Sequence, residues 1–147
     1  IILNNLKRGN FFAVNSARNS GSQTMTDISG FGLSSHLIDI CLSSNLSCEL
    51  ILSPDILINS NIELLKKFQS TGFKNNHKSS RQYIKISESH PLKNILFDPQ
   101  TNGPMLIAIN RQNQKKFENF FSNECEVKPI LIGRFIDKLD KAVYVNE

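Results

Sequence analysis

This chain carries the stretch Met25-Thr26-Asp27-Ile28-Ser29-Gly30-Phe31-Gly32-Leu33. It places one acidic residue in a turn of small residues, directly before a segment with helical periodicity. A helix start presents unpaired N–H groups and the positive end of the helix dipole, so phosphates bind there readily. The Asp27 carboxylate would repel a phosphate unless a cation lay between them. Mg²⁺ typically binds one or two carboxylates together with substrate phosphates, which makes Asp27 a candidate magnesium ligand.

A second interpretation of Asp27 needs no ligand. Asp often caps a helix or starts a turn, because its carboxylate accepts hydrogen bonds from backbone N–H groups. One Asp-x-x-Gly-x-Gly pattern is a weak motif. Taken alone, these residues favour the capping role, and the magnesium role stays open beside it.

Three blocks of the sequence together resemble a known family. The stretch Thr26 to Leu33, followed by His36-Leu37, is similar to the T-D-V-T-G-F-G-L-x-x-H-L segment of selenophosphate synthetases (selenide, water dikinases). The stretch Leu96-Phe97-Asp98-Pro99-Gln100-Thr101-Asn102-Gly103 resembles their L-F-D-P-Q-T-S-G-G, and Ile132-Gly133-Arg134 resembles their late I-G-R. Three blocks in the same order are far more specific than one. The resemblance runs through nearly the whole chain and covers only the C-terminal domain of such an enzyme.

The resemblance implies a fold, a reaction and partners. The fold is α+β, with a mixed β-sheet packed against α-helices, as in the C-terminal domain of the aminoimidazole ribonucleotide synthetase-like superfamily. The full-length enzyme would be an ATP-dependent phosphotransferase that makes selenophosphate, AMP and phosphate from ATP, selenide and water. It would act with Mg²⁺ as a cytoplasmic homodimer, and its nucleotide would be held mainly by N-terminal domains.

The resemblance also assigns roles to residues of this chain. Asp27 would hold Mg²⁺ against the nucleotide phosphates, and Asp98 is a weaker second candidate for a metal ligand. Asp98 precedes Pro99, and an Asp-Pro pair also starts turns for steric reasons alone. No catalytic residue is expected in this chain, because the Lys, the Cys or Sec and the remaining carboxylates belong to the N-terminal half. The turn close to phosphate would be formed by Thr26, Ser29, Gly30 and Gly32.

Two further residues bear on this assignment. His36 could touch a phosphate, although a half-buried histidine with its hydrogen bonds satisfied is the preferred interpretation. Pro104 stands where the family usually has a second Gly, and proline has no backbone N–H. Any phosphate contact through that amide is lost here. The departure supports an alternative function, a non-catalytic scaffold or dimerisation domain in a fused or degenerate homologue.

Length and composition agree with one soluble domain of a larger protein. The chain has 147 residues, starts at Ile1, and is 39% hydrophobic and 20% charged. We expect residues 1–147 to be a single C-terminal domain that lacks its N-terminal ATP-binding domain, and the isolated fragment to be inactive. No apolar run approaches the roughly 20 residues that span a bilayer, so no membrane partner is expected.

Charge and cysteine content exclude other classes of protein. The net charge is +4, but the 17 Lys and Arg residues are scattered and most Phe residues lie at helix-core spacing, so we expect no nucleic-acid partner. Three cysteines, Cys41, Cys48 and Cys125, match no zinc-binding spacing. Cys41 and Cys48 follow apolar patterns and are expected to be buried thiols in a reducing compartment such as the cytoplasm.

Hydrophobic periodicity and turn residues predict the elements. Residues 71–91 are polar and predicted to be a loop or an exposed short helix, and the least protected internal segment. A capping box at residues 60–63 begins a helix that Gly72 should stop. The last two strands are predicted to form a hairpin across residues 137–141. The other predicted helices cover residues 2–20, 31–44 and 112–122, and the strands cover residues 23–26, 46–52, 94–97, 105–109, 127–136 and 142–145.

Overall fold

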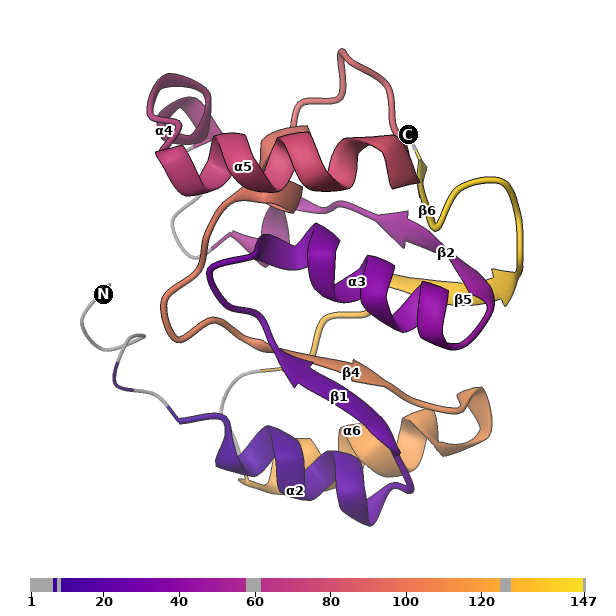
Figure 1. Ribbon diagram of the computed structural model, residues 1–147. Helices are drawn as coiled ribbons and strands as arrows, with labels where there is room; N and C mark the ends of the chain where they lie inside the picture. Colours follow the sequence, from indigo (N-terminus) through magenta and orange to yellow (C-terminus); the bar gives the residue numbers. More distant parts are fainter. Residues whose placement is uncertain (1–6, 8, 58–61, 125–127, 147) are drawn as a thin grey trace. The chain divides into compact units, whose positions relative to one another are not determined.

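The computed structural model describes residues 7, 9–57, 62–124 and 128–146 (Figure 1). The chain divides into two compact units, residues 1–28 with 101–130 and residues 29–100 with 131–147. It passes from one unit to the other after Ile28, after Gln100 and after Ile130. The first two crossings lie inside the blocks quoted above, and the third lies just before the I-G-R block.

The first unit is a two-stranded sheet with two helices. Strand β1 (Thr24–Asp27) pairs antiparallel with β4 (Met105–Ala108), so that Asp27 lies opposite Met105. Helix α2 (Phe11–Asn19) packs against β4 and against α6 (Gln114–Glu124). The apolar core contains Ala17, Leu106 and Phe117. These strands and helices confirm the predicted strands at residues 23–26 and 105–109 and the predicted helix near residues 112–122.

The ends of the two helices follow from local sequence. The Asn110 side chain accepts a hydrogen bond of 3.0 Å from the Gln112 N–H, and thereby starts a 3₁₀ turn (Arg111–Asn113) that leads into α6. Helix α2 begins at Phe11, whereas a helix from residue 2 was predicted. Gly9 and Asn10 are not helical, and the Asn10 side chain donates to the Gly103 carbonyl instead of capping α2. Residues 1–6 and 8 of that prediction lie outside the described residues.

The second unit is a four-stranded mixed sheet with helices against it (Figure 1). Its strand order is β3 (Ile84–Lys85), β6 (Val143–Asn146), β2 (Leu46–Ile51) and β5 (Gly133–Asp137). Helix α3 (Gly32–Ser43) packs against β2, β6 and α5 (Thr71–Ser80). Leu33, Leu37 and Cys41 lie along one face of α3 and are buried, as the periodicity predicted, whereas Ile40 is only half-buried. The predicted α+β class, with a mixed sheet against helices, is confirmed.

The predicted hairpin at the C-terminus is wrong. Strands β5 and β6 do not pair with each other, because β2 lies between them, antiparallel to β5 and parallel to β6. The loop between β5 and β6 is held at the start of β2 by Ser47. Its hydroxyl donates to the Lys141 carbonyl at 2.7 Å and accepts from the Leu139 N–H at 2.9 Å. Residue 127 of the prediction lies outside the described residues.

The predicted strand at residues 94–97 is a 3₁₀ helix, η3 (Lys93–Phe97). A short apolar run does not distinguish a strand from a buried helical turn. Here Leu96 and Phe97 are buried, and η3 packs against α3 and α5. The sequence pattern therefore indicated a buried segment correctly, but the predicted strand conformation is wrong.

The region from residue 62 to residue 91 also differs from the prediction. Helix α4 (Ile62–Lys67) ends before Gly72, and Gly72 lies inside α5. Ser70 caps α5 by accepting a hydrogen bond of 3.1 Å from the Phe73 N–H. The helical alternative for the polar segment is correct, but α5 is not simply exposed, since Phe73, Asn76 and Ser80 are buried. Residues 60 and 61 of the proposed capping box lie outside the described residues.

The two cysteines that the structure describes are buried, as the apolar patterns around them predicted. Cys41 and Cys48 are buried free thiols. Loss of hydration on burial raises the pKa of both, that of Cys48 to about 12. Cys125 lies outside the described residues.

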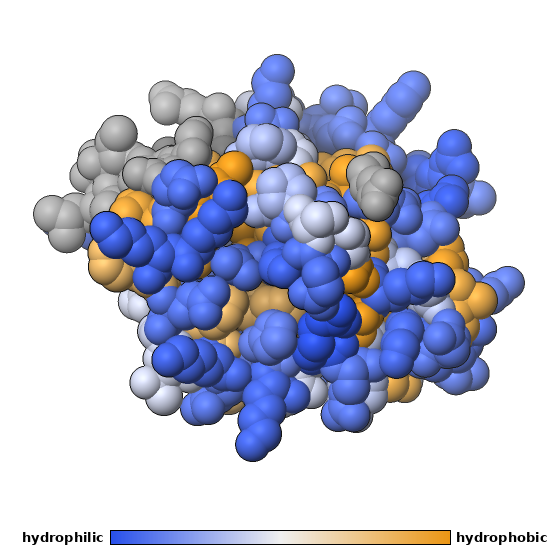
Figure 2. All heavy atoms as spheres, turned by 90° about the horizontal axis from the view of Figure 1, so that it is seen from above, coloured by the Kyte–Doolittle hydropathy of each residue, from blue (hydrophilic) through white to orange (hydrophobic). Residues whose placement is uncertain are grey.

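Figure 2 shows a mostly hydrophilic face with hydrophobic side chains in small groups. In the described part of the chain, no helix has the length and apolar character needed to cross a membrane.

Candidate functional site

Asp27 is the last residue of β1, in the first unit, and it is exposed. The ladder continues one residue further, where the Ile28 N–H donates to the Pro104 carbonyl at 3.0 Å. The Thr26 hydroxyl donates to the Asp27 backbone carbonyl at 3.2 Å. Among the described residues, no ion pair involves the Asp27 carboxylate. A strand end therefore presents this carboxylate to solvent.

The structure contradicts the idea that Asp27 caps the following helix. The residue at the N-cap of α3 is Phe31, four positions beyond Asp27, and no side chain makes a capping hydrogen bond there. The turn before the helix is closed by the backbone instead, through a hydrogen bond of 3.0 Å from the Gly32 N–H to the Ser29 carbonyl.

Within the second unit, the Ser29–Gly32 turn lies against residues 96–100, which belong to the block that resembles L-F-D-P-Q-T-S-G-G. The Ser29 carbonyl also accepts a hydrogen bond of 3.1 Å from the Gln100 N–H. Gly32 has φ +72°, and a Cβ added there would lie 2.9 Å from the Leu96 carbonyl oxygen and 3.2 Å from that of Asp98. Both the backbone conformation and the close approach require glycine. The structure thus brings Ser29, Gly30 and Gly32 together with the turn that contains Asp98.

A side chain that the sequence did not single out joins the same two segments. The Asn76 amide nitrogen donates to the Gly30 carbonyl at 2.9 Å and to the Phe97 carbonyl at 3.1 Å. Asn76 is only 6% exposed. It was overlooked because it lies in a polar stretch that was predicted to be a loop or an exposed short helix. Its spacing from Phe73 and Ser80, three and four residues, is the helical signal that could have revealed it.

His36, on α3, faces the same turn. Its Nε2 atom lies 3.3 Å from the Ser29 nitrogen and 3.4 Å from the Ser29 hydroxyl oxygen. The ring is half-buried. Because the Ser29 N–H donates to it, Nε2 carries the lone pair in this arrangement. The ring is therefore a half-buried histidine whose Nε2 atom has a backbone partner.

Asp98 is half-buried and interacts with its own turn. The Gln100 side-chain amide donates to the Asp98 carboxylate at 2.9 Å. Partial burial raises the pKa of the Asp98 carboxyl, and the Gln100 hydrogen bond opposes that effect. In the described chain, no group of three or more His, Cys, Asp or Glu residues could hold a metal. The carboxylate oxygens of Asp27 are the kind of donor that Mg²⁺ prefers in proteins.

Over residues 12–146 the chain matches the family described as "AIR synthase related protein, C-terminal domain". The chain belongs to this family. The match includes residues of both compact units.

Curated relatives carry the name "Selenide, water dikinase". The chain is 28% identical over 134 residues to the one from Shewanella sp. (strain MR-7), which covers 90% of this chain and 38% of the relative. It is 27% identical over 129 residues to the one from Caldanaerobacter subterraneus subsp. tengcongensis, which covers 86% of this chain and 37% of the relative. The chain therefore spans little more than a third of the relatives it matches.

The third block of this family domain has a structural explanation. A Cβ on Gly133 would clash with the Glu49 carbonyl oxygen, so only glycine lets β5 approach β2 here. The Arg134 guanidinium pairs with the Glu49 carboxylate across the two strands at 2.6 Å. Ile132 accepts a hydrogen bond of 2.7 Å from the Ile51 N–H. The block fastens β5 to β2 and presents no acid, base or nucleophile for chemistry.

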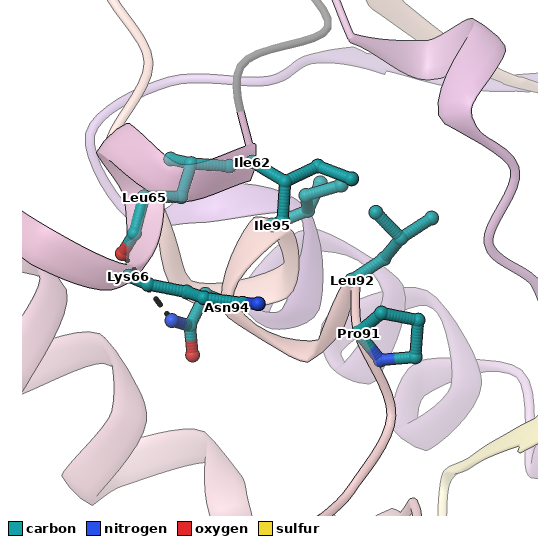
Figure 3. Close-up of a pocket in the computed structure, with 7 residues that line it drawn as sticks. All are labelled: Ile62, Leu65, Lys66, Pro91, Leu92, Asn94 and Ile95. Carbon is teal, nitrogen blue, oxygen red and sulfur yellow. Dashed lines mark hydrogen bonds between the residues drawn. The ribbon is translucent and has the colours of Figure 1, made fainter.

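A shallow depression between α4 and η3 is a weaker candidate (Figure 3). The Asn94 side chain donates to the Leu65 carbonyl at 3.2 Å beside it. Its other lining residues are aliphatic apart from Lys66 and Pro91. The residues that line this depression include no carboxylate, thiol or imidazole.

Proposed function

We propose that this chain is the C-terminal domain of a selenide, water dikinase, which makes selenophosphate, AMP and phosphate from ATP, selenide and water. The names of its curated relatives support this proposal. The observation that carries it is the meeting of two family blocks in the second unit. The Ser29 carbonyl accepts from the Gln100 N–H, and Gly32 lies against the backbone of Leu96 to Asp98.

In this proposal Asp27 is a magnesium ligand. Its carboxylate is exposed at the end of β1, forms no ion pair among the described residues, and does not cap α3. Mg²⁺, when bound, neutralises charge on the nucleotide phosphates during phosphoryl transfer. The residues Ser29, Gly30 and Gly32 shape the turn and let a phosphate approach the backbone closely.

Asp98 is the second, weaker candidate for a metal ligand. Its burial and its hydrogen bond from Gln100 also fit a purely structural carboxyl. We further propose that the full-length protein is a homodimer and that it is cytoplasmic. The free thiols of Cys41 and Cys48 support the reducing compartment. ATP and selenide are its proposed substrates.

The test uses the full-length protein with ATP, Mg²⁺ and selenide under anaerobic conditions. Phosphorus NMR should show a selenophosphate resonance that grows in step with AMP. Omitting selenide, with all else unchanged, should abolish that resonance. ATP consumption with no selenophosphate in the complete mixture would contradict the proposed function.

A non-catalytic scaffold or dimerisation domain is the second candidate function, and Pro104 favours it. Pro104 has no N–H to offer a ligand, and its carbonyl is used by Ile28. The sequence upstream of residue 1 distinguishes the two functions. A Gly-rich segment with a Cys or Sec, a Lys and further Asp residues supports the enzyme.

A further inference from the structure

Asn76 is a buried amide to which the proposed chemistry assigns no role. It lies in the middle of α5, far in sequence from both segments that it contacts. One nitrogen, Nδ2, donates to the carbonyls of Gly30 and Phe97, at 2.9 Å and 3.1 Å. These carbonyls belong to the two blocks that carry the proposed function. These two hydrogen bonds form a clasp that joins the two blocks.

The chemistry of the clasp is specific to a carboxamide. The NH₂ group of Asn offers two N–H donors from one atom, so it can serve two carbonyls at once. An ionised Asp has the same shape but only acceptors, and would face two carbonyl oxygens with a negative charge. Ala would leave both carbonyls without this partner in a buried place, where unpaired polar groups are unfavourable.

The helix that carries Asn76 is itself firmly placed in the second unit. The Phe73 ring packs edge-to-face on Phe97, with centroids 6.0 Å apart, and the His77 ring lies 4.7 Å from Phe97. At the end of α5, the Ser80 hydroxyl lies 3.2 Å from that of Ser35 on α3. These contacts hold α5 in register with α3 and η3, so the Asn76 amide has a fixed position.

We propose that Asn76 is a positioning residue for the phosphoryl-transfer site, an inference that rests on the proposed function. It acts through the backbone of the Ser29–Gly32 turn and touches no substrate. The clasp adds to the Gln100–Ser29 hydrogen bond and sets the conformation of the turn that directly follows Ile28 in the chain. Loss of the clasp lets the turn move away from the geometry that the reaction needs.

The test compares Asn76→Asp and Asn76→Ala in the full-length protein with the matched pair Asn75→Asp and Asn75→Ala. Asn75 is the exposed neighbour on the same helix. Misplaced groups near reacting atoms lower rates by as much as about 100-fold. We expect both Asn76 variants to lower kcat by about 10- to 100-fold, with KM for ATP changed less than kcat. The Asn75 variants should keep the wild-type kcat.

Hydrogen exchange supplies a second readout that needs no substrate. In Asn76→Ala, the amides of Gly32 and Gln100 should exchange about tenfold faster or more, while those of β2 change little. Wild-type kcat in Asn76→Ala, or equal acceleration at all amides, would overturn the proposal. If the wild-type protein makes no selenophosphate, the proposed function fails. In that case, unchanged exchange at the Gly32 and Gln100 amides of Asn76→Ala would also show that Asn76 does not hold the turn.

Discussion

At the scale of single residues, the two glycines of the Ser29–Gly32 turn differ in how much space a side chain would have. Gly32 has a positive φ and lies against the backbone of Leu96, whereas a Cβ on Gly30 would have nothing within 4 Å. The sequence shows both glycines in the same motif and does not distinguish them. Their environments predict opposite responses to the same substitution.

Gly32→Ala should therefore destabilise the chain and Gly30→Ala should not. A left-handed backbone costs a non-glycine residue about 1 kcal/mol, and a new clash costs about 1–3 kcal/mol more. We expect a loss of about 2–4 kcal/mol in the free energy of unfolding for Gly32→Ala, and less than about 0.5 kcal/mol for Gly30→Ala. Urea denaturation at pH 7 measures both. Equal midpoints for the two variants would contradict this explanation.

Asp27→Asn in the full-length protein tests the proposed magnesium ligand. Asn matches Asp in size, and the structure shows no capping of α3 by Asp27, so the melting temperature should be unchanged. Loss of a positioned charge should lower the rate by about 10²–10³-fold. The measurement is selenide-dependent AMP formation at limiting Mg²⁺. Activity within about threefold of wild type, a difference below about 0.7 kcal/mol, would make the assignment wrong.

Asp98→Asn tests the effect of burial on the Asp98 carboxyl. Because its folded-state pKa is raised, this group favours folding below its unfolded pKa, and that contribution is lost as pH rises through the folded value. Asn removes the buried charge and still accepts a hydrogen bond from Gln100. We expect the variant to be more stable at pH 7, by less than about 1 kcal/mol, with no difference near pH 3. Urea denaturation midpoints of the variant and the wild type at both pH values measure this difference. An Asp98→Asn variant that is less stable than the wild type at pH 7 would contradict the explanation.

At the scale of elements, the polar segment 71–91 separates into two parts. Helix α5 is capped by Ser70 and buries Phe73, Asn76 and Ser80. The segment after β3 contains the exposed ion pairs of Glu88 with Arg81 and Lys93. These partners lower the pKa of the Glu88 carboxyl to about 2. Exposed ion pairs contribute little stability and are screened by salt.

Hydrogen exchange should reveal this division. The composition predicts low protection throughout residues 71–91, whereas the structure predicts it only for residues 86–91. Amides in the second half of α5 should exchange more slowly than those of residues 86–91, by about tenfold or more. Adding 0.5 M salt should accelerate only the latter, with β2 as the internal control. Uniform exchange across 71–91 would contradict the packing of α5.

At the scale of the whole molecule, the family match runs through two compact units, and the chain passes between them at or beside all three family blocks. The described residues offer Asp27 as an exposed carboxylate but no cluster of metal ligands. The chain spans 38% of a curated relative. In the proposed function, these residues supply only part of the phosphotransferase site.

The isolated 147-residue chain should fold without hydrolysing ATP appreciably. Folding is expected because each unit buries its own apolar side chains, and inactivity is expected because the proposed metal site would need further ligands. Circular dichroism and a cooperative melt test folding, and AMP and phosphate release test activity against the full-length protein. Mg²⁺-dependent turnover comparable to that of the full-length protein would overturn the proposed division of the site.

The sequence by itself determined the features that depend on neighbouring residues. The spacing of Leu33, Leu37 and Cys41 predicted α3, the alternation around Cys48 and Leu50 predicted β2, and the small residues after Asp27 predicted the turn. Helix periodicity, strand alternation and turn chemistry act over a few residues, so a local pattern is sufficient to identify them. The resemblance of three blocks then predicted the family.

Only the tertiary structure decided the features that depend on distant partners. Placement of β2 between β5 and β6 rests on backbone pairing and on Ser47, which bonds to a loop more than 90 residues away. The 3₁₀ conformation of η3 depends on burial against α3 and α5. The role of Asn76 depends on two carbonyls that lie 46 and 21 residues away in sequence. Such contacts leave no local period, because they form only when the packed core brings the segments together.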